Sequence, residues 1–315
     1  MNKLKPLRIC SFIPSSTEII TSLGLEYLIT GVTFECHSDK PKIVRSILEE
    51  NNYSSEEIEN LVRESTLQNT SLYYIDQGLL EEASPDIIFS QDLCEVCQIG
   101  TSFIEEAINN LKKKPIVISL NPKNFSQVLG SIGLISKTLG FEENGKQLLK
   151  NLQFRIDRIT EVLRKNAAPT KKVMLMEWID PIYNCGHWIP DQINFAGGVD
   201  LLSNSGGYSS TIPWEKVLEY NPEILIIAPC GFKIKRSEKD LEFLTKLKGW
   251  HELHSVKNDQ VYLLDGDLFT SPSTDLVMGI EILSFLFYPD SFNINPDWEN
   301  RVKRLFHIHQ EIYAS

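Results

Sequence analysis

The chain has 315 residues, of which 42% are hydrophobic and 23% are charged, ordinary values for a globular protein that argue against extensive disorder. The formal net charge is −11 and the 31 Lys and Arg residues are scattered, so neither nucleic acid nor an anionic membrane surface is expected as a partner. No apolar run approaches the roughly 18 residues of a membrane span, so membrane insertion is not expected.

A strand, a tight turn and a helix are predicted at the start of the chain. The apolar run 8–13 indicates the strand, and Pro-Ser-Ser-Thr-Glu at 14–18 is typical of a helix start with a Ser or Thr cap. Exposed amides at such a start can hold an anion or a carbonyl-rich ligand, and a plain capped helix is the alternative. The candidate ligand contacts here are Pro14, Ser15, Ser16 and Thr17.

The first half continues with strands at 28–33, 85–90 and 115–120. The segment 41–74 is polar, contains a helix from Ser54, and is interpreted as an insertion. Ligands of open α/β sheets bind outside the carboxyl ends of the strands, so the residues just after these strands are functional candidates. They are Glu35, Cys36, Gln91, Asp92, Cys94 and Cys97.

Two helices are predicted in the middle of the chain. The pattern at 125–139 indicates the first, and apolar residues at three- and four-residue steps through 141–165 indicate a long amphipathic helix of roughly 36 Å. Strand and helix signals of the same kind lie on either side. We therefore expect an N-terminal α/β lobe at 1–122, a helical linker at 123–166 and a C-terminal α/β lobe at 167–315.

The second half repeats the plan of the first. Strands are predicted at 172–178, 223–228 and 261–264, with a helix opening after Gly-His-Trp at 186–188 and another at 214–220. Their ends add further candidate contacts: aromatic residues that could form an apolar wall for a flat ligand, a histidine that could be an axial metal ligand, and polar or loop residues. These are Trp178, Asp180, His187, Trp188, Tyr208, Gly231 and Phe232.

Several motifs occur in a recognisable order from about residue 8 to residue 290. They are Pro-Ser-Ser-Thr-Glu at 14–18, the Pro85-Asp86 strand, Ala-Gly-Gly-Val-Asp at 196–200, Pro-Trp-Glu at 213–215, Asn-Pro-Glu at 221–223, and Trp250 with Val-Lys-Asn at 256–258 and Val261-Tyr262. Together they resemble the cobalamin-binding periplasmic proteins of ABC importers, the class that binds cobalamin, haem and siderophores. The resemblance implies two Rossmann-like α/β lobes joined by a long rigid helix, with the ligand in the cleft between them.

A cytosolic branch of that family is indicated by three further motifs. Gln-Asp-Leu-Cys-x-Val-Cys at 91–97, Gly-His-Trp at 186–188 and Pro-Cys-Gly-Phe at 229–232 are similar to those of the branch, and residues 1–7 do not read as an export signal. The expected location is cytoplasmic. Importer-bound members dock on the permease through one surface acid on each lobe. Glu215 falls at the second such position and Gly78 near the first, which weakens an ABC permease as a partner.

Four cysteines follow predicted strand ends and could hold a soft metal, zinc, an iron–sulfur cluster or the metal of a bound macrocycle. They are Cys36, Cys94, Cys97 and Cys230. Burial as inert thiols is the alternative, and redox chemistry is a third. No nucleophile and base at motif spacing and no phosphate-binding glycine loop is found, so no enzymatic activity is predicted.

The preferred interpretation is a non-catalytic protein that holds a corrinoid (cobalamin-like) or related metal-containing ligand in the cleft between the two lobes, with cobalamin and haem among the candidate cofactors. The alternative is a cytosolic protein that carries a metal or iron–sulfur centre on the four cysteines and has a redox or enzymatic role. The sequence does not choose between individual ligands.

Overall fold

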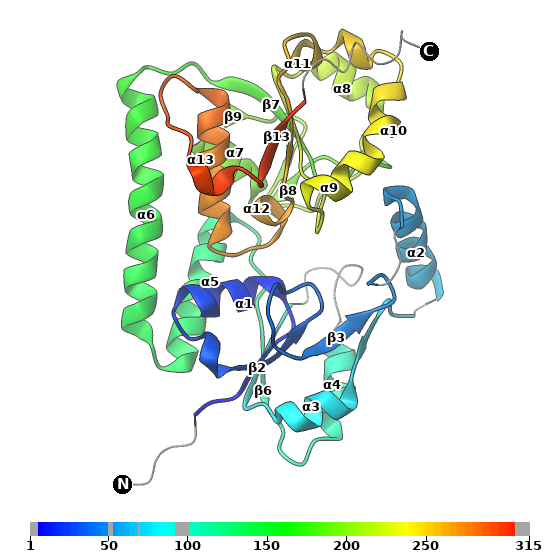
Figure 1. Cartoon of the computed structure of the whole chain (residues 1–315), viewed down its shortest axis with the longest axis vertical. Helices are drawn as coiled ribbons and strands as arrows, with labels where there is room; N and C mark the ends of the chain where they lie inside the picture. The colour runs from blue at the N-terminus through cyan, green and yellow to red at the C-terminus, as the bar shows by residue number, and fades with distance from the viewer. Residues whose placement is uncertain (1–5, 50–52, 69, 92–100, 306–315) are drawn as a thin grey trace. The chain divides into compact units, whose positions relative to one another are not determined.

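The computed structural model describes residues 6–49, 53–68, 70–91 and 101–305, with the side chains of 101–103 left aside. The chain divides into two α/β units, drawn with the intervening helices in Figure 1. Unit 1 comprises Met1–Tyr53, Glu57–Pro122 and Leu129–Leu149, and unit 2 comprises Ser54–Glu56, Lys123–Val128 and Lys150–Ser315. The predicted α/β class with a sheet in each half is confirmed.

Unit 1 contains a six-stranded sheet in the order β4-β3-β2-β1-β5-β6. Neighbouring strands are parallel except β3 and β4, which are antiparallel. The central strands β1 and β5 are buried along their whole length, as expected of apolar strands with helices on both faces. The strands are β1 Ile9–Ser11, β2 Ile29–Thr33, β3 Lys42–Ser46, β4 Tyr73–Ile75, β5 Ile87–Ser90 and β6 Ile116–Ser119.

The segment 41–74 differs from the expectation of a polar insertion, because β3 and β4 belong to the sheet and Ile43 and Val44 are fully buried. Short, mixed apolar and polar runs gave too weak a periodicity to show these strands. The helices that connect the strands of unit 1 are α1 Pro14–Ser22, η1 Glu26–Leu28, α2 Ser55–Gln68, α3 Gln77–Ala83 and α4 Thr101–Asn109.

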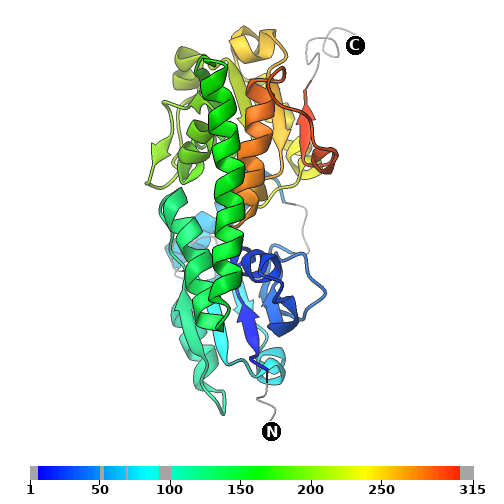
Figure 2. The ribbon, with the colours of Figure 1, turned by 90° about the vertical axis from the view of Figure 1, so that its left-hand side faces the viewer.

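The two long helices of the middle segment are confirmed, α5 at Phe125–Leu139 and α6 at Glu142–Lys165. In unit 1, the Asn144 side chain of α6 donates to the carbonyl of Leu23 at 3.1 Å. In unit 2, Arg155 of α6 forms a bidentate ion pair with Glu281 at 2.7 and 2.8 Å. Glu281 is on α13 (Asp275–Phe287), which Figure 2 shows beside α6. Both units take residues from segment 123–166, and the predicted domain boundaries stay a prediction.

Unit 2 contains a five-stranded sheet in the order β13-β12-β11-β7-β9, parallel except for β13. A separate two-stranded sheet pairs β8 with β10. The strands are β7 Lys171–Met176, β8 Gly186–His187, β9 Gly198–Val199, β10 Asn204–Ser205, β11 Ile224–Ile227, β12 Val261–Leu264 and β13 Val302–Arg304. Four of these, β8, β9, β10 and β13, were not expected, because two- and three-residue strands leave no pattern in the sequence.

Helices cover the unit 2 sheet and complete its core around Met176, Ile227 and Trp250. The helical segments are α7 Ile189–Phe195, α8 Trp214–Tyr220, α9 Ile234–Ser237, η2 Glu238–Asp240, α10 Leu241–Lys246, η3 Trp250–Glu252, α11 His254–Lys257, α12 Asp267–Thr270, α13 Asp275–Phe287 and η4 Pro296–Trp298. Among the described residues, no helix has both the length and the apolar composition needed to cross a bilayer.

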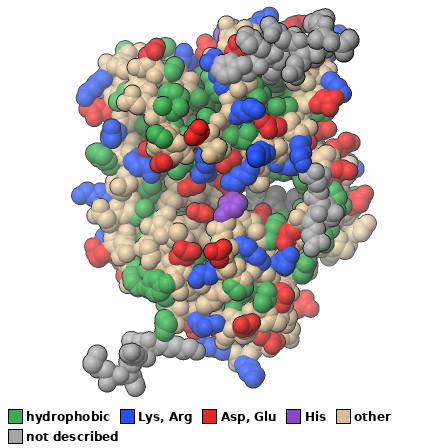
Figure 3. Space-filling view, in the orientation of Figure 1, with side chains coloured by type: hydrophobic (Ala, Val, Ile, Leu, Met, Phe, Trp, Pro, Cys, Tyr) green, Lys and Arg blue, Asp and Glu red, His purple; other side chains and the backbone are tan. Residues whose placement is uncertain are grey.

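Acidic and basic side chains are interspersed on the face shown in Figure 3. This surface agrees with the scattered positions of the charged residues in the sequence.

Candidate functional site

The loops at the carboxyl ends of β7, β11 and β12 lie at one edge of the unit 2 sheet. They are the segments 177–188, 228–233 and 265–267. The strands are parallel, so these ends fall side by side, at the edge where open α/β sheets bind ligands. This edge is the candidate functional site of unit 2.

An aromatic stack occupies this edge. The rings of Trp178, after β7, and Phe232, after β11, have centroids 4.9 Å apart at 49°. Arg236 is on α9, and its guanidinium lies 4.1 Å from the centroid of the Phe232 ring, a distance typical of a cation–π interaction. Phe232 is only 7% exposed, whereas Trp178 is half-buried and its indole N–H donates to the Asp180 carbonyl at 3.1 Å. Trp178 is therefore a positioned aromatic face that solvent can reach.

Main-chain hydrogen bonds tie the three loops together. The Cys230 amide donates to the Glu177 carbonyl at 3.0 Å, and the Gly266 amide donates to the Phe232 carbonyl at 2.8 Å. A Cβ on Gly266 would lie 2.1 Å from the carbonyl oxygen of Pro229, so only glycine lets these loops approach so closely. The stack thus rests on a rigid backbone arrangement.

Charged groups flank the third loop. The Lys233 ammonium lies 2.6 Å from the Asp267 carboxylate and 3.3 Å from that of Asp265, which also pairs with Arg301 at 3.1 Å. Asp265 is 4% exposed, so its charge is compensated by these two cations rather than by water. The network fixes the loop after β12 next to Phe232.

The Gly-His-Trp motif forms β8 and the start of α7, held by main-chain bonds to the loop after β10. The His187 amide donates to the Gly207 carbonyl at 2.6 Å, and a Cβ on Gly186 would lie 2.5 Å from the amide nitrogen of Ser209. The imidazole lies 5.2 Å from the Tyr208 ring and 5.3 Å from the Trp188 ring, centroid to centroid. Burial lowers the pKa of His187, so its ring is neutral at pH 7, the form that ligates metals.

The predicted aromatic wall divides into exposed and buried members. Tyr208 is 59% exposed, whereas Trp188 is 4% exposed and its indole N–H donates to the Phe269 carbonyl at 2.6 Å. Trp188 therefore belongs to the core of unit 2. Asp180 and Gly231 lie on the loops of the candidate edge, and burial raises the pKa of Asp180.

The β1–α1 turn of unit 1 does not offer its hydroxyl groups to solvent. Ser15, Ser16 and Thr17 are 2%, 0% and 4% exposed. The Ser16 hydroxyl donates to the Ile13 carbonyl at 3.2 Å, and the Thr17 hydroxyl donates to the Ser11 hydroxyl at 2.8 Å. The expectation of a Ser or Thr cap is wrong, because the cap position is Ile13, Pro14 is the first helical residue and no side chain caps the helix.

The cysteines differ in environment. Cys36 is 5% exposed, its sulfur lies 3.1 Å from the Thr17 hydroxyl, and burial raises its pKa to about 11, whereas Cys230 is exposed. Among the described residues, no group of three or more His, Cys, Asp or Glu is arranged to hold a metal ion. Asp92, Cys94 and Cys97 lie outside the described residues, so the four-cysteine centre stays a prediction. Of the remaining candidates in unit 1, Glu35 is exposed and Gln91 is buried at the end of β5.

Comparison with known proteins decides the family. Residues 79–268 match the family model described as periplasmic binding protein. The chain belongs to the periplasmic binding protein family. This membership makes it a solute-binding protein, while its ligand and the predicted cytosolic branch stay predictions.

This periplasmic binding protein is similar to the uncharacterized ABC transporter substrate-binding lipoprotein YvrC of Bacillus subtilis (strain 168). The two are 27% identical over 298 residues, which cover 92% of this chain and 82% of the relative. Two solved structures share its fold. A periplasmic haem-binding protein from Pseudomonas aeruginosa has a TM-score of 0.68, 16% identity and coverage of 92% and 96% of the two chains. The periplasmic vitamin B12 binding protein BtuF of Vibrio cholerae has a TM-score of 0.61, 16% identity and coverage of 90% and 98%.

Three residues of the candidate edge in this periplasmic binding protein were missed by the sequence reasoning. Lys233 and Gly266 follow strands 224–227 and 261–264, so the same strand-end rule could have found them. Arg236 lies within α9, away from any strand end, so the strand-end rule does not select it, and its guanidinium contacts the Phe232 ring four residues earlier in the chain.

Proposed function

We propose that this chain is a non-catalytic binding protein for a corrinoid or a related metal-containing macrocycle, with the carboxyl edge of unit 2 as a contact surface. The observation that carries the proposal is the partly exposed ring of Trp178, which packs against Phe232, with Arg236 close to the Phe232 ring. Flat, largely apolar ligands are held by such aromatic faces together with a few placed polar groups. The fold likeness to proteins named as binding vitamin B12 and haem supports this class of ligand.

His187 would be a polar contact or an axial ligand to the metal of the macrocycle. Its ring is held between Tyr208 and Trp188 and is neutral at pH 7, so no proton has to leave before the nitrogen binds metal. Tyr208, which is mostly exposed beside it, would provide a second aromatic contact.

Titration of the full chain with cyanocobalamin, cobinamide and haem, followed by calorimetry and visible spectroscopy, tests this function. Trp178→Ala should weaken binding of whichever macrocycle binds by roughly tenfold, about 1.4 kcal/mol. Tyr27→Ala is the control, because that ring is 65% exposed in unit 1 and lies before the amino end of β2, not at the carboxyl end of a strand. Failure of all three compounds to bind, or equal affinity of the Trp178 and Tyr27 variants, would overturn the proposal.

His187→Gln separates the two roles of the histidine. An axial ligand predicts a shift in the visible bands of the bound macrocycle, whereas a hydrogen-bonding role predicts weaker binding with unchanged bands.

We further propose that the protein works with an ABC permease and that Glu215 contacts this permease. The Bacillus relative is named as an ABC transporter substrate-binding lipoprotein, which supports a partner of this class. Glu215 is exposed in the first turn of α8, where a partner's cation can reach it. Glu215→Lys should leave macrocycle affinity unchanged and abolish association with the permease in reconstituted liposomes. A cytoplasmic location, expected from the sequence, would exclude docking from outside the cell, and fractionation of cells that express the full gene decides the location.

A further inference from the structure

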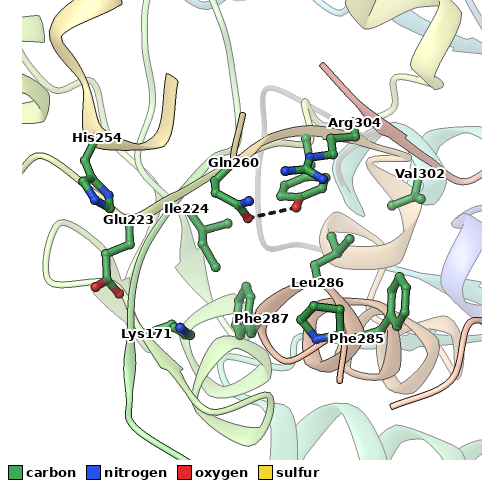
Figure 4. Close-up of a pocket in the computed structure, with 12 residues that line it drawn as sticks. Lys171, Glu223, Ile224, His254, Gln260, Phe285, Leu286, Phe287, Val302 and Arg304 are labelled. Atoms are coloured by element: carbon green, nitrogen blue, oxygen red, sulfur yellow. Dashed lines mark hydrogen bonds between the residues drawn. The ribbon is translucent and has the colours of Figure 1, made fainter. Parts of the chain in front are cut away.

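A pocket of about 470 Å³ lies at the edge of the unit 2 sheet opposite to the candidate site. Lys171 begins β7, Ile224 begins β11 and Gln260 directly precedes β12, so the pocket lies at the amino ends of these parallel strands. Its other walls come from the end of α13 and from β13. Figure 4 shows Lys171 and Glu223 on one side of the pocket and Val302 of β13 on the other. The pocket is built within unit 2, and its described lining shares no residue with the carboxyl-edge loops.

Much of the pocket lining is apolar. Ile224, Leu286 and Phe287 line it and are 4%, 8% and 3% exposed. Phe285 and Val302 also line it and are partly exposed. Covering apolar surface of this kind is favourable, and a cavity of this volume is in the size range of small-molecule sites, so it has room for apolar side chains.

Strand β13 has one face toward the pocket and the other toward the core of unit 2. Val302 and Arg304 line the pocket, whereas Leu305 belongs to the core cluster together with Val261. β13 is antiparallel to β12, with Arg304 opposite Tyr262. The Leu305 amide donates to the Val261 carbonyl at 2.9 Å, so the pairing reaches the first residue of β12. The chain therefore leaves β13 at the amino edge of the sheet, beside the pocket.

The sequence after β13 carries the same alternation of side chains. Ten residues follow Leu305, and they begin Phe-His-Ile-His. Because successive side chains of a strand lie on opposite faces, the register of β13 and β12, if continued, assigns Phe306 and Ile308 to the pocket face, with Phe306 opposite Gln260. The two histidines between and after them fall on the other face. Apolar residues thus occur at the positions that would meet the apolar pocket.

We propose that segment 306–315 of this chain is the occupant of the pocket. The segment continues from β13 past Gln260 and buries Phe306 and Ile308 against the apolar surface of Leu286 and Phe287. Both residues lie within three residues of the end of β13, so an extended chain carries them no farther than about 10 Å from the rim of the pocket. The covalent connection gives the segment an effective concentration in the millimolar range, which favours it over a free ligand or a second copy of the chain.

Methyl NMR of the full chain tests the contact. Nuclear Overhauser cross-peaks should join the Ile308 methyl groups and the Phe306 ring protons to the methyl groups of Leu286. Truncation after Leu305 should remove these cross-peaks and shift the Leu286 signals, because their neighbours are gone.

Three outcomes of this experiment would overturn the proposal. One is the absence of any cross-peak between the segment and Leu286. Another is cross-peaks that appear only between differently labelled copies, because they would place the segment in the pocket of a second molecule. The third is cross-peaks from Leu286 to a copurified compound and none to the segment, because a small molecule would then be the occupant.

Protease sensitivity measures the docking, because a segment is cut only when it opens. Chymotrypsin cleavage after Phe306, divided by the rate for a synthetic peptide of the same sequence, should be roughly tenfold faster in Ile308→Ser, since the burial of an aliphatic side chain is lost. His309→Ser is the matched control on the other face and should change this ratio by less than about twofold. Equal effects of the two variants would contradict the assigned faces and overturn the proposal. Thermal unfolding checks that each variant is folded, and if Ile308→Ser does not fold, the cross-peaks of the unchanged protein decide alone.

Discussion

The carboxyl edges of the two sheets are built from different chemistry. In unit 1, the turn from β1 to α1 is a closed network of hydroxyl and thiol groups, in which Thr17 lies between Ser11 at 2.8 Å and Cys36 at 3.1 Å. In unit 2, the loops after the strands carry a partly exposed Trp178, an exposed Tyr208 and an exposed Cys230. The polar groups of the unit 1 edge bond to one another inside the fold, whereas the unit 2 edge exposes side chains to solvent.

The difference shows that a position after a strand can carry an accessible side chain but does not have to, so the position alone does not identify a functional residue. Small hydroxyl side chains at the first turn of a helix can reach the main chain and one another, and burial then makes their mutual hydrogen bonds obligatory. The unit 2 loops carry larger aromatic side chains, and there Trp188 and Phe232 are buried whereas Trp178 and Tyr208 keep part of their surface in contact with solvent. Four predictions sharpen this contrast, in order of decreasing effect.

The unit 2 edge depends on close backbone contact, so Gly266→Ala should be the most damaging of these changes. The added Cβ would lie 2.1 Å from the Pro229 carbonyl oxygen. We expect the free energy of unfolding to fall by roughly 3–4 kcal/mol. This is at or above the largest loss usual for substitutions that overpack a core, because the clashing atom belongs to the backbone and cannot move aside easily. Gly130→Ala, where nothing lies within 4 Å of the added atom on α5, should instead gain up to about 1 kcal/mol in urea unfolding. Equal effects of the two changes would refute the close-contact argument.

A pH dependence is expected in unit 2 from Asp200, which is 7% exposed and accepts from the amides of Leu175 and Leu202 at 3.0 and 2.9 Å. Burial raises its pKa from 3.8 to about 6. The folded state therefore binds the proton more tightly than the unfolded chain, so this group destabilises the protein above about pH 6, and the cost disappears as the pH falls toward 4.

The size of this effect is on the order of 2–3 kcal/mol from the difference in pKa. Urea unfolding between pH 4 and pH 7 should show that the stability of the native protein relative to Asp200→Asn falls with rising pH. A constant difference, or one that grows with pH, would show that the carboxylate is not held in this way.

The hydroxyl network of unit 1 should respond to loss of a single donor. Thr17→Val keeps the shape of the side chain but leaves the buried Ser11 hydroxyl and Cys36 thiol without this partner, which should cost about 1–2 kcal/mol. Thr66→Val on α2 removes an exposed hydroxyl bonded only to the Val62 carbonyl at 2.9 Å and should change stability by less than about 0.5 kcal/mol. If both changes cost the same in thermal unfolding, the network is not a stabilising feature of that edge.

The smallest effect is expected outside both edges. Glu215→Gln removes a carboxylate from the first turn of α8 and should cost less than about 1 kcal/mol through the helix dipole. Glu219→Gln, in the last turn of the same helix, removes an unfavourably placed charge and should be neutral or slightly stabilising. A larger loss for Glu215→Gln would mean that this acid has a structural role and is a poor candidate for docking.

Local patterns were sufficient for the long elements. The apolar stripe Leu152, Ile156 and Ile159 predicted α6, and the run 125–139 predicted α5, because the 3.6-residue period repeats many times in each. Strands of two or three residues, such as β8 and β13, have no such repeat, and pairing with a partner distant in sequence defines them. The sequence likewise predicted Trp178, His187 and Phe232 as candidates, but not the contact of Trp178 with Phe232, which joins segments distant in sequence.

The sequence by itself determined the α/β class, the order of the main elements and the family, because these follow from repeated local periodicity and from motifs of neighbouring residues. Only the tertiary structure decided which strand-end residues are enclosed and which are reachable. Ser16 and Trp178 both follow strands, yet Ser16 is fully buried and Trp178 is partly exposed. Burial depends on which distant segments pack over a position, and a local pattern contains no information about them.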